Sequence, residues 1–428
     1  TRHDGTPCFY PYAVQYYRAE LLMFMGLWAG AEQAMRRNLA WSGQSGDAGQ
    51  RSDSLLDLGR LAMLRDDDYR TAIGLLDEAL QLAQGRDYHH NTIRALSNIA
   101  GCHWRLGEFD RALEFYQRSL DLARRTGDPH TEAVALSNIG TIHQNRGNDG
   151  DALRCYEQAR ALFRRLGDVY RESQVTGSMG VVHYDRGRLA EAQSCYQEKM
   201  RIARLVQDGS GLAYALGSLA MVHADLGQDE QALRCYGEAG TLARQRGDLR
   251  LQAINLGNLG GLHKQRGRLQ QAIACLDGAI AIAGPLGIKF YLADFHYHRA
   301  DARCRAGELA GAAADAVRAL ALTAALDNPD DLFKCRALRL RLRCLMAGGR
   351  RGREAALGAL ERMLPFAPGP ALRADLLYDL RALRRLAGDG GRARGYGAQA
   401  ARAYAELLRA TPKQEYRDRL AELAKGPA

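Results

Sequence analysis

A glycine recurs every 40 residues through the middle of the chain, at Gly107, Gly147, Gly187, Gly227, Gly267 and Gly307. Each of these glycines is followed five residues later by an alanine and preceded seven residues earlier by an alanine or a glycine. A tyrosine stands nine residues after the first four, at Tyr116, Tyr156, Tyr196 and Tyr236. Because several positions keep one register, the chain is a repeat protein whose units stack on their neighbours to bury their apolar faces.

Each repeat predicts two helices. In the copy around Gly107, apolar residues recur at helical spacing in the segments 93–106 and 108–125. Gly107 separates the two segments, and Gly127 followed by Pro129 ends the second one. The sequence contains no strand pattern. We therefore predict an all-α fold, a right-handed superhelix (α-solenoid) of about ten helix-turn-helix repeats, whose first helices line a concave groove.

The register divides the chain into five parts. We expect an N-terminal lead-in at 1–11, two divergent repeats at 12–92 and six regular 40-residue repeats at 93–332. Two degenerate, arginine-rich repeats follow at 333–413, and a capping helix with a tail covers 414–428. Because the first residue is Thr1 and not Met, we expect the chain to be processed or cut from a longer one.

The composition narrows the class of protein further. An apolar share of 46% and a charged share of 25% are ordinary for a folded soluble protein. No stretch of about 18 uncharged apolar residues is present, and no secretory leader opens the chain. The nine cysteines contain no CxxC pair, which argues against structural zinc and favours a reducing compartment, the cytoplasm.

The common catalytic motifs are missing from the sequence. It contains no GxxxxGK[ST], no GxGxxG after a strand, no GxSxG and no HExxH. We therefore expect a protein that is not an enzyme and that binds no cofactor and no metal.

The candidate site is a set of polar residues nine positions before five of the glycines, which we call the polar ladder: Asn98, Asn138, Ser178, Ser218 and Asn258. The repeat spacing places them on the same face of successive first helices. Asparagine offers both donors and an acceptor, so such a column can pair with the backbone of an extended peptide. The residues just before them are small, at Ser97, Ser137, Gly177, Gly217 and Gly257, which leaves room for a backbone. The alternative is that these residues serve helix packing and that the asparagines bridge neighbours.

Other groove positions differ between copies and are expected to carry specificity for a protein or peptide ligand. With the polar ladder they complete the predicted peptide-binding set: Arg94, Trp104, Arg105, Gln144, Tyr184, Tyr214 and Lys264. Basic groups lie at the early end and at Lys264, with acidic groups between them. This arrangement favours a mixed-charge segment with apolar anchors.

The order of small residue, aromatic, glycine turn, alanine and aromatic resembles the tetratricopeptide repeat family, whose usual period is about 34 residues. The 40-residue form looks like the repeats of Pins/LGN polarity adaptors and kinesin light chains, and like the sensor arrays of bacterial STAND-type ATPases and transcription regulators. The resemblance implies a binding scaffold, with an asparagine ladder that holds a peptide backbone. It also implies a recognition or sensor module of a larger bacterial signalling protein.

Histidines and cysteines recur with the same period. The histidines are His103, His143, His183, His223 and His263, and the cysteines are Cys155, Cys195, Cys235 and Cys275. Packed helices lie about 8–10 Å apart, whereas a metal requires each nitrogen at about 2.0–2.1 Å. We therefore interpret the histidines as core aromatics, and the cysteines as small buried hydrophobic residues.

The C-terminal part carries the excess positive charge. Between Arg336 and Ala410 there are 16 arginines and 6 acidic residues, which accounts for the whole net charge of +10. Two clusters are expected on helix faces, Arg336 with Arg339 and Arg343, and Arg381 with Arg384 and Arg385. Binding of a nucleic acid or an acidic partner at Arg336–Arg409 is the alternative function. Aromatic residues for base stacking are sparse there, which favours a solvated outer face. Self-association through the terminal repeats is a further alternative.

Overall fold

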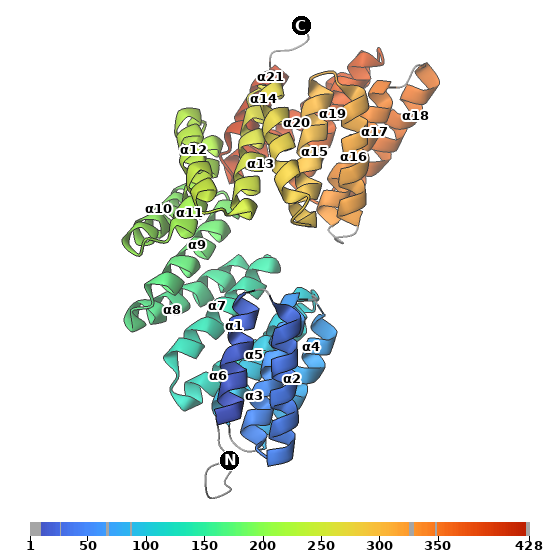
Figure 1. Ribbon diagram of the computed structural model, residues 1–428. Helices are drawn as coiled ribbons and strands as arrows, with labels where there is room; N and C mark the ends of the chain where they lie inside the picture. Colours follow the sequence, from blue (N-terminus) through green and yellow to red (C-terminus); the bar gives the residue numbers. More distant parts are fainter. Residues whose placement is uncertain are drawn as a thin grey trace, which may run out of the picture. The chain divides into compact units, whose positions relative to one another are not determined.

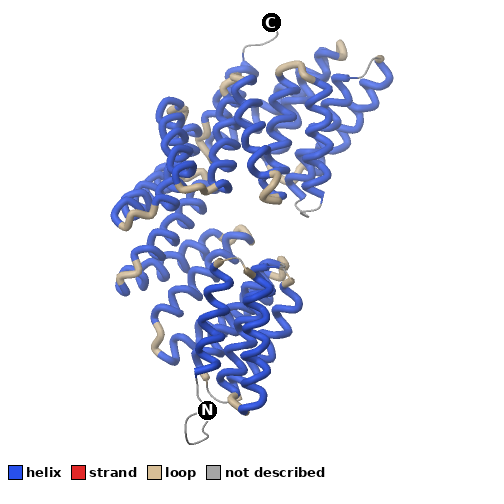
Figure 2. The backbone as a smooth tube through the Cα atoms, viewed as in Figure 1, coloured by secondary structure: helices blue, strands red, loops and turns tan. Residues whose placement is uncertain are grey.

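The computed structural model describes residues 10–25, 27–65, 68–85, 88–324, 329–346 and 349–424. Within these residues every regular element is a helix and no strand occurs (Figures 1 and 2). The N-terminal helices are α1 (Tyr10–Phe24), α2 (Trp28–Ser45), α3 (Ala48–Arg65), α4 (Tyr69–Gln84), α5 (His89–Arg105), α6 (Phe109–Thr126), α7 (Pro129–Asn145), α8 (Asp149–Leu166) and α9 (Val169–Asp185). The next are α10 (Leu189–Leu205), α11 (Gly209–Asp225), α12 (Asp229–Gln245), α13 (Leu249–Gln265), α14 (Leu269–Ala283), α15 (Lys289–Arg305) and α16 (Leu309–Ala324). The last are α17 (Pro329–Met346), α18 (Arg350–Met363), the 3₁₀ helix η1 (Leu364–Phe366), α19 (Pro370–Leu386), α20 (Gly390–Ala410) and α21 (Gln414–Ala424).

The chain forms two compact units, Thr1–Val182 and His183–Ala428, here called the N-terminal and the C-terminal unit. In the N-terminal unit α3 packs on α4, α5 on α6 and α7 on α8, while α4 packs on α5 and α6 on α7. The C-terminal unit repeats this scheme from α10 to α20. Successive helix pairs that each pack on the next make an α-solenoid, which confirms the predicted all-α repeat fold.

The 40-residue glycine closes the first helix of each pair. Gly107 has a φ of 76° and donates its N–H to the carbonyl oxygen of Trp104, and the next residue, Glu108, donates to the carbonyl of His103. This pair of bonds is the Schellman motif, whose left-handed residue is normally glycine because a Cβ is disfavoured there. The same motif recurs at Gly147, Gly187, Gly227, Gly267 and Gly307. The sequence register is therefore the register of a helix-ending turn.

A second set of left-handed residues, 20 positions after the first, closes the second helices. Four of them are glycines, Gly127, Gly167, Gly247 and Gly287. At the equivalent place in the turn after α10 stands Gln207, with a φ of 55°. It is the one non-glycine residue with positive φ among the described residues.

Small residues allow the two helices of a pair to approach closely. The alanines five positions after each glycine, from Ala112 to Ala312, are fully buried. A Cβ added at Gly140 would lie 2.8 Å from the ring of Tyr156, and one added at Gly260 would lie 2.8 Å from Leu276. The repeated small residue thus makes room for the large side chain of its own helix pair.

None of the helices in the described part of the chain combines the length and the apolar composition needed to cross a bilayer.

Gln207 predicts a stability change. Replacing it by glycine removes the cost of a left-handed conformation at a residue with a Cβ, which is roughly 1–2 kcal/mol, offset in part by the greater freedom of glycine in the unfolded chain. We expect Gln207→Gly to stabilise the C-terminal unit by about 1 kcal/mol, measured by urea unfolding followed by circular dichroism. Gln207→Ala, which keeps the strain, is the control, and equal stability of the two variants would contradict this explanation.

Candidate functional site

The polar ladder of the N-terminal unit lies on successive first helices. Asn98 is on α5, Asn138 on α7 and Ser178 on α9, and all three are half-buried. Among the described residues, no side chain hydrogen bonds to the amide of Asn98 or Asn138. Ser178 donates its hydroxyl to the Gln174 carbonyl of its own helix at 3.4 Å. Two rungs therefore offer amide groups that can bind a ligand.

The small residues before the ladder have a packing role. A Cβ added at Gly257 would lie 2.0 Å from the ring of Phe295, and one at Gly217 would lie 2.7 Å from the side-chain oxygen of Asn255. In both cases the neighbour belongs to the next first helix. Their interpretation as room for a ligand backbone is therefore wrong for Gly217 and Gly257, since the next repeat fills that space.

Two of the predicted specificity residues in the N-terminal unit, Arg94 and Gln144, contact polar groups of the protein itself. The guanidinium of Arg94 lies 3.1 Å from a carboxylate oxygen of Asp53 and 3.3 Å from one of Asp57. Asp57 is almost fully buried, and this burial raises its pKa to about 6 despite the opposing charge of Arg94. Gln144 accepts a hydrogen bond from the hydroxyl of Tyr156 at 2.9 Å.

Trp104 and Arg105 form a stacked pair at the end of α5. The guanidinium carbon of Arg105 lies 5.0 Å from the centre of the Trp104 ring. Arg105 is exposed, Trp104 is half-buried, and the indole N–H is buried without a hydrogen-bond acceptor. Among the predicted residues of the N-terminal unit, Trp104 with Arg105 and the two asparagines Asn98 and Asn138 therefore have groups that can still bind a ligand.

In the C-terminal unit the last rung of the ladder lines a pocket, which we call the amide pocket. It has a volume of about 180 Å³, and its lining includes Tyr184, Met221, Asp225, Asn258, Asp294 and His298. The amide nitrogen of Asn258 lies 3.7 Å from the sulfur of Met221. His298 is 40 residues after Asn258 and so continues the ladder by one further rung.

Of the other predicted residues of this unit, Tyr184 also lines the amide pocket. Tyr184 donates its hydroxyl to Asp225 at 2.8 Å. Ser218 is half-buried one repeat before Asn258. Tyr214 is 42% exposed, and the ammonium of Lys199 lies 5.1 Å from the centre of its ring. Of the ladder residues of this unit, Asn258 is the one that lines the pocket.

Lys264 begins a row of alternating charges on four consecutive first helices. Its ammonium lies 3.2 Å from Asp301, and Arg341 lies 3.3 Å from Asp301 and 3.2 Å from Asp379. Burial acts to raise the pKa of Asp301, but the charges of Lys264 and Arg341 hold it well below its ordinary value. At Asp379 burial prevails over Arg341, and its pKa is raised.

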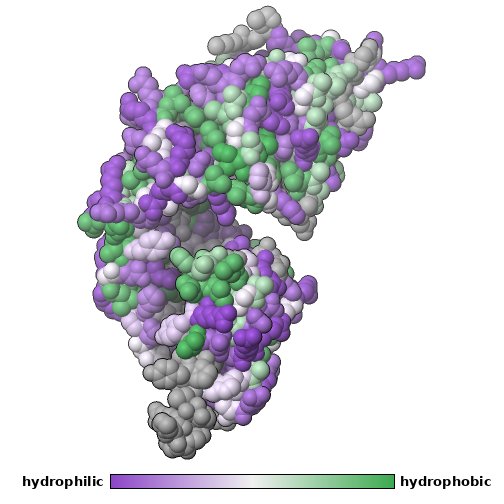
Figure 3. Space-filling model, viewed as in Figure 1, coloured by the Kyte–Doolittle hydropathy of each residue, from purple (hydrophilic) through white to green (hydrophobic). Residues whose placement is uncertain are grey.

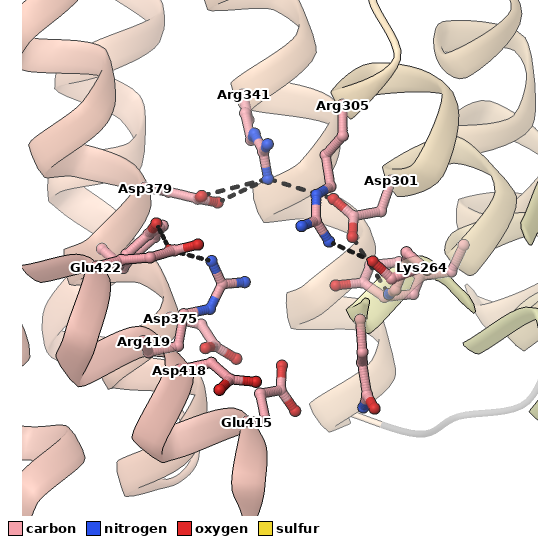
Figure 4. A pocket seen from close by; sticks show the side chains of 13 residues that line it. Lys264, Asp301, Arg305, Arg341, Asp375, Asp379, Glu415, Asp418, Arg419 and Glu422 are labelled. Carbon is pink, nitrogen blue, oxygen red and sulfur yellow. Dashed lines mark hydrogen bonds and ion pairs between the residues drawn. The ribbon is translucent and has the colours of Figure 1, made fainter. Parts of the chain in front are cut away.

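These charges line a second space, the charged cavity, whose other wall is α21. The cavity has a volume of about 130 Å³. Figure 4 shows Glu415, Asp418, Arg419 and Glu422 of α21 on one side and Lys264, Arg305 and Arg341 on the other. Desolvation in the cavity raises the pKa of Asp375 to about 6. The Tyr404 hydroxyl, which donates a hydrogen bond of 2.5 Å to this carboxylate, acts to lower the pKa but does not cancel the effect of burial.

Sequence reasoning missed most of the charged cavity, although one signal was available. Asp301 follows Gly261 by 40 residues and Arg341 follows Asp301 by another 40, so both occupy one register position. Extending the register position of Gly261 into the next two repeats would have found them. The contribution of α21 had no such signal, because α21 lies outside the repeat.

Of the two expected arginine clusters, the second is wrong in one member, Arg384. Arg384 is 2% exposed, and its guanidinium bonds to Glu361 at 2.7 Å and to Glu354 at 2.8 Å. It is therefore not available to a nucleic acid, which corrects its assignment to a surface cluster with Arg381 and Arg385. Arg336 and Arg339 are exposed, and the side chain of Arg343 lies outside the described residues. The visible face of this unit mixes hydrophilic and hydrophobic residues (Figure 3).

The periodic histidines have different environments. His103 is buried, stacks on Phe115 and bonds to Glu108 at 2.7 Å, whereas His223 bonds to Gln228 at 2.6 Å. The four periodic cysteines are half-buried, and none of the four is in a disulfide bond. Within the described residues no group of three histidine, cysteine or carboxylate side chains is arranged to hold a metal ion.

Comparison with known proteins identifies the repeat. The tetratricopeptide repeat model matches four overlapping ranges, 61–125, 91–165, 131–205 and 171–245. Residues 61–245 are therefore tetratricopeptide repeats, and the helix pairs that follow them continue the same solenoid. None of the curated proteins has a significantly similar sequence.

Solved structures with a similar fold include signalling proteins. A Rap protein in complex with competence and sporulation factor is 15% identical, with a TM-score of 0.58, and the match covers 85% of this chain and 99% of that one. The apo quorum sensor NprR from B. thuringiensis is 14% identical, with a TM-score of 0.55, over 83% and 99%. A STAND protein with a tetratricopeptide repeat sensor from Pyrococcus horikoshii is 17% identical, with a TM-score of 0.50, over 85% and 56%. At these levels of sequence identity, the similarity to the three structures shows a shared fold only.

The Arg94–Asp57 pair predicts a stability that depends on pH. Arg94→Ala leaves a buried carboxylate without its cation, which we expect to cost the N-terminal unit about 2–3 kcal/mol at pH 7. Because the folded-state pKa of Asp57 is about 6 with Arg94 present and rises further without it, the cost grows as pH rises above about 6 and shrinks below that pH.

Urea unfolding of Arg94→Ala at pH 4.5 and pH 7 tests this prediction. The double variant Arg94→Ala/Asp57→Asn is the control, and it should lose the pH dependence. If Arg94→Ala lowers the free energy of unfolding by the same amount at both pH values, the result would contradict the role of Arg94 as the partner of a titrating Asp57.

Proposed function

We propose that this protein is a non-catalytic scaffold that holds an extended segment of a protein or peptide along the first helices of its repeats. The amide pocket is the proposed anchor in the C-terminal unit. In the N-terminal unit the proposed contacts are Asn98 and Asn138, next to Trp104 and Arg105.

The observation that carries this proposal is the state of the ladder amides. Asn98 and Asn138 are half-buried yet bond to no described side chain, and Asn258 contacts a thioether inside an open pocket. An amide in such a place loses part of its hydration without gaining a strong bond. A peptide backbone supplies the missing donors and acceptors, and an extended backbone presents them regularly along its length.

The fold supports a role in signalling. The matched structures are a Rap protein bound to a sporulation factor, a quorum sensor and a STAND protein with a repeat sensor. We propose by analogy that this chain is the recognition or sensor module of a bacterial signalling protein and works in the cytoplasm. Nucleic-acid binding at Arg336–Arg409 is less favoured, since Arg341 and Arg384 are committed to internal ion pairs.

A selection of displayed random peptides on the full chain tests the proposal. We expect the triple variant Asn98→Ala/Asn138→Ala/Asn258→Ala to bind the selected peptides at least tenfold more weakly than wild type, because each lost backbone bond contributes roughly 1 kcal/mol. Affinity is measured by fluorescence anisotropy, and retention of the fold by circular dichroism.

The matched control removes three amides from exposed positions of second helices, Gln117→Ala/Gln158→Ala/Gln197→Ala. If this control binds the peptides with wild-type affinity and the ladder variant binds them more weakly, the result supports peptide binding at the polar ladder. Equal affinity of the ladder variant and wild type would overturn the assignment of the ladder as the peptide site.

A further inference from the structure

The C-terminal segment 411–422, here called the strap, folds back onto its own unit. The apolar side of α21, with Tyr416, Leu420 and Leu423, packs on the cluster around Tyr404 and Leu377. This side attaches α21 to the last helix pair. The opposite side is polar and contacts helices far away in the chain.

The polar contacts reach three earlier repeats. The ammonium of Lys413 lies 3.3 Å from the carboxylate of Asp225 and 5.0 Å from the centre of the Tyr184 ring. Asp418 accepts a bond of 3.3 Å from Arg266, which is 152 residues earlier. The strap therefore crosses the ends of α9, α11 and α13, next to the amide pocket.

The backbone of the turns fits the strap closely. A Cβ added at Gly187 would lie 2.3 Å from the methyl carbon of Thr411, and one added at Gly227 would lie 3.0 Å from the side-chain oxygen of Gln414. The equivalent turn at Gly267 has the same left-handed conformation, but no atom lies within 4 Å of the added Cβ. The strap thus covers two turns and leaves the next one open.

Asp225 and Tyr184 together form a site for a cation. The carboxylate of Asp225 faces Lys413, the face of the Tyr184 ring lies beside it, and both side chains line the amide pocket that contains Asn258. A carboxylate and an aromatic face are the two groups that bind an ammonium or a guanidinium most favourably.

We propose that the strap occupies, in the folded chain, the site used by an external segment, and that Asp225 and Tyr184 bind a lysine or arginine side chain of that segment. This inference rests on the proposed function and names the chemistry of its ligand. An external segment binds by displacing Lys413.

The energetics allow this exchange. Lys413 is partly exposed whereas Asp225 is buried, so the desolvation of Asp225 offsets much of the attraction between the two charges. The strap competes mainly because it is tethered, which gives it an effective concentration in the millimolar range. A segment with comparable contacts and a few additional bonds to the ladder therefore displaces it.

Hydrogen exchange of the full chain tests the position of the strap. Lys413→Glu places a carboxylate against Asp225, and we expect amide exchange across 411–418 to rise at least tenfold. Gly187→Ala is expected to do the same by collision with Thr411. The controls are Arg417→Glu, which changes an exposed residue of α21, and Gly267→Ala, which has the same turn strain. Equal exchange in the variants and their controls would overturn the proposal.

A labelled peptide of residues 409–424 tests whether the strap is a ligand. The peptide is used at concentrations 100-fold below the effective concentration of the tethered strap. Under these conditions we expect no binding to wild type and saturable binding to the Lys413→Glu chain. The peptide with Lys413→Arg should bind, and the peptide with Lys413→Glu should not. Failure of the unmodified peptide to bind the opened chain would overturn the proposal.

These outcomes separate the two proposals. The hydrogen-exchange experiment uses no added ligand and the peptide experiment uses a segment of this chain, so both succeed or fail regardless of the ladder variant. If displayed peptides bind through the ladder and Lys413→Glu leaves their affinity unchanged, the proposed function stands and the strap inference falls. If Lys413→Glu raises their affinity at least tenfold while Arg417→Glu does not, both proposals are supported.

Discussion

The left-handed glycine that ends each first helix is the constraint on which the rest of the structure depends. Its two backbone bonds satisfy carbonyls that a helix end otherwise leaves unpaired, and they turn the chain within a few residues. Because the turn is the same in each regular repeat, each helix pair leaves in the same direction. Within each unit, residues 40 apart therefore fall on one face, which is what aligns the rungs of the polar ladder.

The charged row consists of Lys264, Asp301, Arg341 and Asp379, and it places ion pairs between first helices that follow the same repeat geometry. From Lys264 to Asp379 each charge has an opposite neighbour on the next helix, so adjacent repeats are joined by ion pairs in addition to apolar contacts. Pairs of this kind stabilise little once desolvation is counted, but removing one partner is costly. Such a row fixes the alignment of neighbouring repeats more than it adds to their stability.

Much of the fold could be predicted from the sequence, because a periodic glycine and a periodic alanine report backbone and packing directly. The site was less accessible. The periodicity placed Asn98, Asn138 and Asn258 on one face, but it could not show that Phe295 and Asn255 fill the space beside Gly257 and Gly217. That depends on side chains of the next repeat. The role of Arg384 was also hidden, since composition cannot tell a buried ion pair from an exposed charge.

The strap was inaccessible to sequence reasoning for a different reason. Its contacts join residues about 150 or more positions apart, and no period relates Lys413 to Asp225 or Asp418 to Arg266. A repeat array has only neighbour contacts by construction, so its groove stays open unless a segment outside the repeat returns to it. The strap is held on the earlier repeats by the ion pairs of Lys413 and Asp418, and such polar contacts can be exchanged for those of another segment. An apolar segment in the same place would be difficult to displace, because its release would expose hydrophobic surface on both sides.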